Sequence, residues 1–256
     1  MNGPASPLAA AAPGEGKPGA ADTADLPGVR VDAWLRGAAD TPVLGLNLAC
    51  AWPFPEELRT AYEQWTKELT QLDAGAWLYP FAQTHVTLAT LLSFARFPRP
   101  GPTHGQTVAS VARRCVEAWE DWRKEGDGVT VCPFELHFAG LRLDSAAAFL
   151  EWRNPSGEVE LIRRFADGWA HSEAGLWQVL QAGGFTVPRI IHSTVLRFRA
   201  LPSDFGAFRA GFDRLARQME FRPLRVSAVL LTAETQPYMR AGRTLRRLAL
   251  DGASPA

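Results

Sequence analysis

This sequence lacks several features that would place it in a large structural class. Its 256 residues contain no run of about eighteen apolar residues, so it predicts no membrane span. Its three cysteines, Cys50, Cys115 and Cys132, are odd in number and widely spaced. This spacing argues against a disulfide framework and a zinc ribbon, and it favours a reducing compartment. The formal net charge of zero argues against a protein that coats long nucleic acid.

The first 38 residues predict a disordered tail, and residues 39–252 predict a single domain built from two lobes. The tail is rich in Ala, Gly and Pro and shows no apolar periodicity. It lacks the long apolar stretch of a signal peptide, and it is poorer in Arg and Ser than a transit peptide. We therefore expect a cytoplasmic or nuclear protein, and targeting to an organelle is left open.

Hydrophobic periodicity predicts a mixed pattern of strands and helices in the order β α β α β β α β α β β. The predicted strands are 43–52, 81–94, 130–143, 146–154, 188–201, 224–235 and 243–250. The predicted helices are 53–72, 106–126, 157–177 and 203–220, the last with Ser203 or Asp204 as its N-cap.

The order strand, helix, strand, strand occurs twice, starting at His85 and again at Ile190. This repeat predicts an α+β fold of two pseudo-symmetric lobes, each an antiparallel sheet with helices packed outside, around a central cleft. The first strand and helix would complete the first lobe, and the helix at 158–172 would complete the second. Clefts between lobes commonly bind ligands, so the chemistry is expected there.

One short motif stands at the start of each repeat. His85 and Thr87 lie in "HVTL", and His192 and Thr194 lie in "HSTV", 107 residues further on. Because a strand sends alternate side chains to opposite faces, each histidine shares a face with the threonine two residues later. The plain alternative is a pair of buried histidines, each bonded to a neighbouring threonine.

Two histidines facing each other across a cleft suit the cleavage of a phosphodiester. Histidine titrates near neutral pH, so one imidazole could take a proton from the attacking oxygen while the other gives one to the leaving oxygen. Each threonine hydroxyl could bind a non-bridging phosphate oxygen. The sequence lacks carboxylate clusters and His-x-His or H-E-x-x-H spacings, so we expect no metal and no cofactor.

The paired motifs resemble those of the two-histidine (2H) phosphoesterase superfamily, which includes the LigT-like 2'-5' RNA ligases and cyclic phosphodiesterases. The resemblance covers roughly residues 40–250. It implies a phosphodiesterase acting on short RNA ends or small nucleotides, at a 2',3'-cyclic phosphate or a 2'-5' linkage. It further implies His85 and His192 as the acid/base pair and Thr87 and Thr194 as phosphate binders. Which histidine is the base, which phosphodiester is cleaved and whether the chain ligates stay open.

Further candidates lie near the expected cleft. Residues 189–247 hold twelve arginines against four acidic residues, which indicates either solvated faces or a local site for an anionic substrate. In the loop between the last two strands, Tyr238 could stack on a base and Arg240 or Arg243 could bind phosphate, a plain hairpin loop being the alternative. Arg197 is left out of the site, because its odd offset from His192 puts it on the opposite face unless the strand has a bulge.

Several other residues have a structural and a functional interpretation. Trp52, at the end of the first strand, could stack on a base or pack in the core, and the same choice applies to Tyr79 and Phe81. The remaining histidines, His104, His137 and His171, are interpreted as structural or surface residues. The chain is longer than the compact bacterial members of the family, and either of its long segments, 93–104 and 172–188, could cover the cleft.

Two other functions compete with catalysis. One is a binding module for RNA ends or nucleotides that keeps the fold without turnover, and the other is a purely structural domain, which would leave the paired motif unexplained. We expect no membrane association and no stable protein partner, and the oligomeric state stays open.

Overall fold

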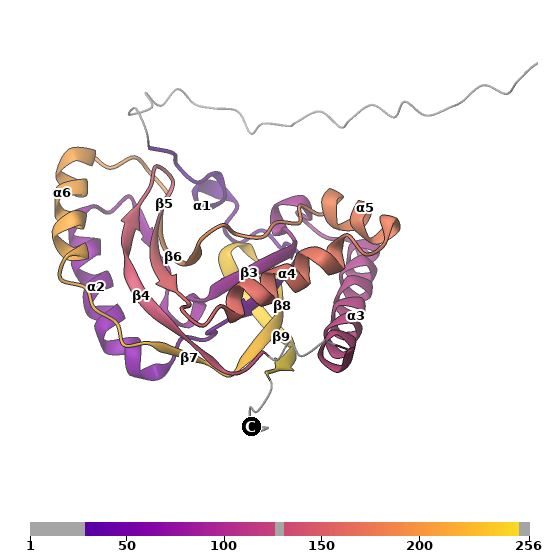
Figure 1. The fold of residues 1–256 in the computed structure, drawn as a ribbon. Helices are drawn as coiled ribbons and strands as arrows, with labels where there is room; N and C mark the ends of the chain where they lie inside the picture. The colour runs from indigo at the N-terminus through magenta and orange to yellow at the C-terminus, as the bar shows by residue number, and fades with distance from the viewer. Residues whose placement is uncertain (1–28, 126–130, 251–256) are drawn as a thin grey trace, which may run out of the picture.

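The computed structural model describes residues 29–125 and 131–250 of the chain (Figure 1). Its elements form two antiparallel sheets with helices packed outside, which confirms the predicted α+β architecture. The predicted tail overlaps the described part at residues 29–38, and these residues include a short helix, α1 (Ala33–Gly37). Residues 1–28 of the tail lie outside the described residues.

The first sheet has four strands in the order β3-β1-β8-β9. Their bounds are Val86–Leu92 for β3, Gly45–Cys50 for β1, Ala228–Gln236 for β8 and Ala241–Ala249 for β9. Every neighbouring pair is antiparallel. All six residues of β1 are buried, because it is a central strand covered on both faces.

The second sheet has five strands in the order β2-β6-β5-β4-β7. Their bounds are Ala76–Leu78 for β2, Ile191–Phe198 for β6, Ala147–Arg153 for β5, Phe134–Leu143 for β4 and Leu224–Val226 for β7. The strands β4 and β5 form a hairpin around Asp144, in the gap between the predicted strands 130–143 and 146–154. The edge strands β2 and β7 have three residues each.

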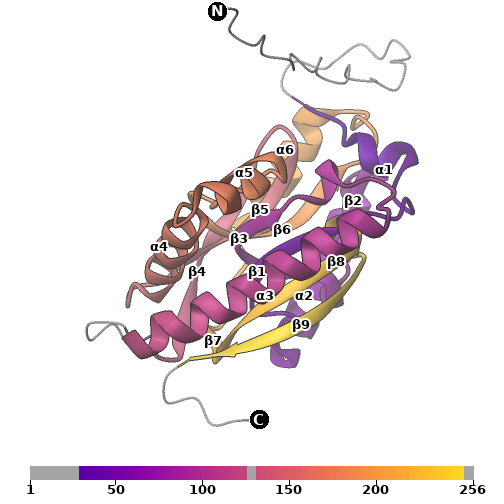
Figure 2. The same cartoon turned by 90° about the vertical axis from the view of Figure 1, so that its right-hand side faces the viewer.

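Helices cover the outer face of each sheet. On the second sheet lie α2 (Arg59–Leu72) and α6 (Phe205–Ala216), and on the first lie α3 (Pro102–Glu125) and α4 (Glu158–Ala170), with α5 (Ala174–Ala182) beside α4. Figure 2 shows α3 lying across β1, β8 and β9. Asp204 is the N-cap of α6, as predicted, and its carboxylate accepts a hydrogen bond from the Ala207 N–H at 2.9 Å.

The two lobes are not consecutive in the sequence, contrary to the simplest interpretation of the repeat. The first repeat contributes β3 to one sheet and the β4–β5 hairpin to the other. The second repeat contributes β6 and the short strand β7 to the second sheet and the β8–β9 hairpin to the first. Each hairpin therefore pairs in the sheet of the other repeat. Tertiary pairing decided this exchange, since either hairpin could extend either antiparallel sheet.

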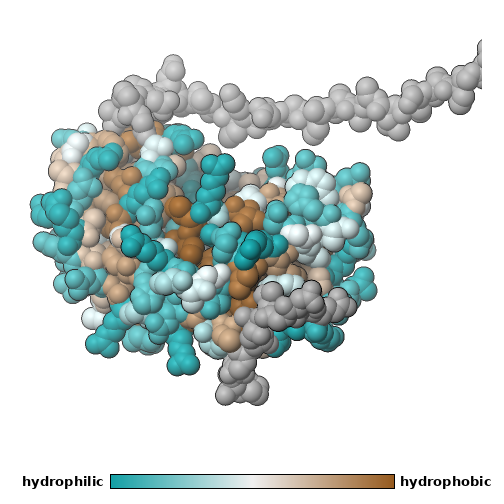
Figure 3. All heavy atoms as spheres, in the orientation of Figure 1, coloured by the Kyte–Doolittle hydropathy of each residue, from teal (hydrophilic) through white to brown (hydrophobic). Residues whose placement is uncertain are grey.

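One continuous hydrophobic core joins both sheets to their helices. Its largest fully buried side chains include Trp119, Tyr62, Phe198, Phe208 and Phe212. In α4, the buried residues Val159, Ile162, Ala166 and Trp169 recur every three or four positions, so one stripe of the helix faces the sheet. Figure 3 shows polar residues around the edge of one face and apolar residues gathered between the two halves.

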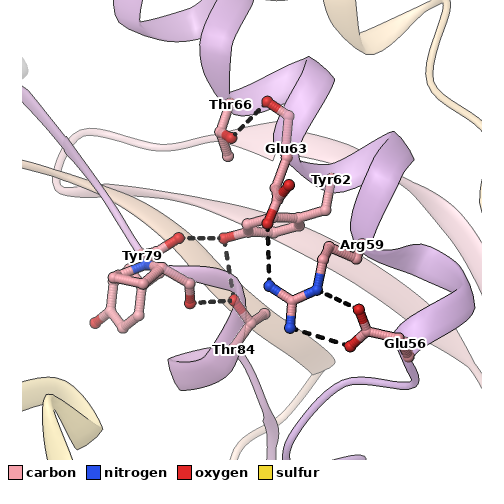
Figure 4. Close-up of polar contacts among 8 residues, drawn as sticks. Glu56, Arg59, Tyr62, Glu63, Thr66, Tyr79 and Thr84 are labelled. Atoms are coloured by element: carbon pink, nitrogen blue, oxygen red, sulfur yellow. Dashed lines mark hydrogen bonds and ion pairs between the residues drawn. The ribbon is translucent and has the colours of Figure 1, made fainter.

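A buried tyrosine fixes the chain just before β3. The Tyr62 hydroxyl, on α2, donates a hydrogen bond to the carbonyl oxygen of Tyr79 at 2.6 Å and accepts one from the Thr84 hydroxyl at 3.0 Å (Figure 4). Thr84 is fully buried, so these bonds replace water. On the same helix the guanidinium of Arg59 lies over the Phe81 ring, 4.6 Å from its centre. This packing holds the η2 turn (Phe81–Gln83) that leads into His85.

We expect Tyr62→Phe to lower the free energy of unfolding by about 1–3 kcal/mol, because the Tyr79 carbonyl and the buried Thr84 hydroxyl would lose a partner. Equilibrium unfolding in urea measures this change. The control is Thr66→Val, which removes an exposed hydroxyl from the same helix and should change stability by less than about 0.5 kcal/mol. Equal stability of Tyr62→Phe and wild type would show that the buried hydroxyl stabilises nothing.

Candidate active site

The two strands that carry the His-x-Thr motifs lie next to each other at the meeting of the two sheets. The segment before β6 is bonded to β3: the Thr90 N–H donates to the Thr186 carbonyl at 2.8 Å, and the Thr186 N–H donates to the Thr90 carbonyl at 3.0 Å. The Ser93 N–H also donates to the Gly183 carbonyl at 2.7 Å. These backbone bonds hold one motif strand against the approach to the other.

Between the strands lies a cleft with a volume of about 220 Å³. It contains both histidines and both threonines of the predicted site, together with Tyr238. The other lining residues are Asn47, Tyr79, Thr90, Ser93, Phe94, Pro188, Arg197, Glu234 and Met239. Ser93 and Phe94 come from one of the two long segments expected near the cleft, and Pro188 ends the other.

His85 stands immediately before β3 and is held by its own backbone turn. Its Nδ1 lies 2.8 Å from the carbonyl oxygen of Gln83. Because a carbonyl only accepts, Nδ1 carries the proton and Nε2 of the neutral ring is free to act as a base. Burial lowers the pKa of His85 below its ordinary value of 6.5; the bond to Gln83 opposes this shift and the nearby His192 adds to it.

His192 repeats this arrangement in β6. Its Nδ1 lies 3.3 Å from the carbonyl oxygen of Ile190, again two residues earlier. The same carbonyl accepts a hydrogen bond from the buried guanidinium of Arg163 at 2.8 Å. Burial lowers the pKa of His192; the Ile190 carbonyl opposes this effect, and the charges of Arg163 and Arg197 add to it. The two imidazoles thus share one tautomer and both favour the neutral form.

The threonines of the two motifs share the cleft with their histidines, as strand alternation predicts. Within the described residues, neither the Thr87 nor the Thr194 hydroxyl makes a hydrogen bond to the protein. Both are therefore open to a ligand. The neighbours of these threonines in the strands point into the core. Val86 and Leu88, on either side of Thr87, are fully buried. Ser193, just before Thr194, is also buried, and its hydroxyl accepts a hydrogen bond from the Trp152 indole at 3.1 Å.

Arg197 lines the cleft, although regular strand alternation places it on the opposite face. In the pairing of β5 with β6, the consecutive residues Ala148 and Phe149 lie opposite Leu196 and Thr194. Val195 therefore has no partner in β5 and is an extra residue in β6. This β-bulge shifts the alternation by one, and Arg197 therefore joins the face of His192. The bulge is stabilised in part by the neighbouring chain, because the Tyr79 N–H donates to the Val195 carbonyl at 3.0 Å. Nothing in the local sequence marked its position.

Tyr238 reaches the cleft from the η4 turn (Pro237–Met239), where its backbone has a left-handed conformation with φ of 63°. The guanidinium of Arg197 lies over its ring, 4.4 Å from the centre. The buried carboxyl of Glu234 holds this turn by accepting a hydrogen bond from the Met239 N–H at 2.8 Å. Burial raises the pKa of Glu234 to about 7, against the opposing effect of this bond and of Asn47.

Two predicted site residues, Trp52 and Arg240, are not among the residues that line this cleft. The Trp52 indole donates a hydrogen bond to the Ala82 carbonyl at 3.0 Å. The Arg240 guanidinium pairs with Asp40 at 3.0 Å, because the η4 turn directs it toward the N-terminal segment. Of the two other aromatic candidates, Tyr79 lines the cleft, whereas Phe81 packs in the core against Phe54.

The described part of the chain offers neither a metal site nor a membrane-spanning helix. Within residues 29–125 and 131–250, no three His, Cys, Asp or Glu side chains gather in a way that could hold a metal ion. No helix in this part of the chain combines the length and the apolar character that crossing a membrane requires.

The chain matches no protein-family model, and no curated protein is significantly similar in sequence. Solved structures do match. TT0787 of Thermus thermophilus superposes with a TM-score of 0.51 at 15% identity, over 82% of this chain and 100% of that one. Escherichia coli LigT complexed with 3'-AMP gives 0.44 at 17% identity, over 83% of this chain and 99% of that one. ATU0111 of Agrobacterium tumefaciens gives 0.49 at 11% identity, over 84% and 90%.

These identities are low, and the match therefore concerns the fold. The predicted α+β fold, two antiparallel sheets with helices packed outside, is confirmed, and this chain shares its fold with TT0787.

Proposed function

We propose that this protein is a metal-independent phosphodiesterase that acts on RNA ends or small nucleotides by acid/base catalysis with His85 and His192. One observation carries the proposal. Two imidazoles face the same small cleft, and a backbone carbonyl two residues earlier orients each of them. This arrangement leaves Nε2 of both rings for proton transfer with a ligand.

The proposed step is an in-line displacement at phosphorus. One histidine accepts the proton of the attacking hydroxyl through Nε2, and the new P–O bond forms as the opposite P–O bond breaks. The other histidine, in its protonated form, donates its proton to the leaving oxygen. For a 2',3'-cyclic phosphate the attacking group is water, and for a 2'-5' linkage in RNA it is either water or the neighbouring ribose hydroxyl.

The cleft also supplies donors for the phosphate itself. The hydroxyls of Thr87 and Thr194 are free of protein hydrogen bonds within the described residues, and each stands beside its histidine. Arg197 adds a positive charge on the same strand face as Thr194. Such donors stabilise the negative charge that the phosphoryl oxygens carry in the transition state.

The size of the cleft supports a small substrate. A volume of about 220 Å³ suits a nucleotide or the end of a chain rather than a duplex. The rings of Phe94 and Tyr238 line it and stand in edge contact, 5.2 Å apart at their centres. They offer apolar surface for a base or ribose beside the phosphate.

Replacing either histidine should abolish nearly all turnover. We expect His85→Ala and His192→Ala each to lower kcat by a factor of about 10²–10⁴, because each removes one of two proton-transfer groups. The assay is hydrolysis of a 2',3'-cyclic nucleotide and of a short 2'-5' linked RNA with EDTA present. His137→Ala, which changes a half-exposed histidine on β4, is the control. An inert wild type that still binds the RNA would instead identify a binding module.

The pH dependence of kcat/KM should report the two lowered pKa values. The base works only when neutral and the acid only when protonated, so activity needs a pH near the two pKa values. Because both lie below 6.5 in the free enzyme, we expect a maximum below pH 6.5 and a fall as the pH rises further. Initial rates with a 2',3'-cyclic nucleotide across pH 4.5–9 test this. A plateau extending above pH 8 would rule out a protonated histidine as the acid.

Removing the motif hydroxyls should weaken the transition-state contacts and leave the strands intact. For Thr87→Val and Thr194→Val we expect kcat/KM to fall by about tenfold each, since each variant loses a hydrogen bond to a charged phosphate worth about 1.5 kcal/mol. Steady-state kinetics on the preferred substrate measures the loss. Thr70→Val, an exposed position on α2, provides the control. Full activity in both motif variants would remove the threonines from the mechanism.

A further inference from the structure

The N-terminal strap, residues 29–44, connects both halves of the molecule beside the cleft. On the second sheet the Arg30 N–H donates to the Ser145 carbonyl and the Asp32 N–H donates to the Phe198 carbonyl, both at 2.7 Å. On the other side, the Trp34 ring contacts Phe94 edge to face, with 5.3 Å between ring centres. Figure 1 shows the helix of this segment, α1, beside β6.

The carboxylate of Asp32 makes contacts in two directions. Its Oδ1 caps α1 by accepting hydrogen bonds from the N–H groups of Trp34 at 3.0 Å and Leu35 at 3.2 Å. Its Oδ2 accepts a hydrogen bond from the Tyr238 hydroxyl and another from Nη1 of Arg197 at 3.3 Å. The side chain is 9% exposed, so these contacts are shielded from water.

Arg197 is thereby held at three points. Its Nε donates to the Tyr79 hydroxyl at 3.1 Å, its Nη1 donates to Asp32, and its plane lies over the Tyr238 ring. Within the described residues Nη2 makes no hydrogen bond to the protein, and the side chain lines the cleft. Although burial disfavours its charge, the contacts with Tyr79, Tyr238 and Asp32 raise the pKa of Arg197 above its ordinary value.

We infer that Asp32 is a positioning residue of the active site, which orients the Arg197 guanidinium so that Nη2 meets a phosphate oxygen of the ligand. This inference deepens the proposed function and rests on it for the identity of the ligand. A flexible arginine would lose rotamer freedom when it binds the phosphate, whereas this one is ordered before the ligand arrives. The N-terminal strap then belongs to the site.

The opposite possibility is that Asp32 competes with the phosphate for Arg197. The cap argues against it. Because Oδ1 is bonded to two N–H groups of α1, the carboxylate would have to leave the helix end in order to release the guanidinium. In addition, the bond to Asp32 uses Nη1 and leaves Nη2 to the cleft.

The test compares Asp32→Asn with Asp40→Asn. Asparagine is as good an N-cap as aspartate, so Asp32→Asn should keep α1 and lose the negative charge that holds Arg197. Asp40→Asn removes the same charge from the same strap at an exposed position paired with Arg240. Calorimetric titration with inorganic phosphate should show about tenfold weaker binding for Asp32→Asn, the cost of immobilising one long side chain, and no change for Asp40→Asn.

A second comparison tests whether Asp32 affects phosphate binding through Arg197. In an Arg197→Met background, adding Asp32→Asn should weaken phosphate binding no further, because the effect passes through the guanidinium. Three results would each overturn the inference. The first is that Asp32→Asn binds inorganic phosphate as tightly as wild type or more tightly. The others are that Asp32→Asn still weakens phosphate binding in the Arg197→Met background, or that wild type binds no inorganic phosphate. Binding needs no turnover, so a wild type that binds phosphate but cleaves no substrate would refute the proposed function and leave this test intact.

Discussion

The exchange of hairpins between the two sheets is the constraint on which the rest of the structure depends. Each motif strand pairs within one sheet, while the hairpin that follows it in sequence extends the other sheet. The connecting segments must therefore cross between the halves, and β3 and β6 are brought side by side. The bonds between Thr90 and Thr186 complete this junction. A cleft with one histidine on each wall follows from that pairing.

The cleft combines half-buried histidines with positive charge. Partial removal from water favours the neutral form of both imidazoles, and Arg163 and Arg197 shift the pKa of His192 further in the same direction. A bound phosphodiester would bring a negative charge into this setting. That charge favours protonation of one imidazole, so ligand binding itself would promote the split into one acid and one base. The orientation of the bound substrate would then determine which of the two imidazoles is protonated.

Support for the site comes from all parts of the chain. Tyr62 on α2 fixes the turn before His85, Glu234 on β8 fixes the turn that carries Tyr238, and Asp32 on the N-terminal strap contacts Arg197. These supporting residues are buried or nearly so, and hydrogen-bond partners far away in sequence satisfy them. The side chains proposed to react are thus held on strands and turns whose positions the fold sets.

The sequence by itself determined the fold class, the core-facing stripes of the helices and the two His-x-Thr pairs, because these features depend on local periodicity and on residue chemistry. Only the tertiary structure decided which hairpin joins which sheet, since an antiparallel edge accepts either. It also decided that Arg197 faces the cleft, because the extra residue Val195 arises from pairing with β5 and has no local signal. The contact of Asp32 with Arg197 joins residues 165 positions apart, and a composition typical of a tail gave no indication of it.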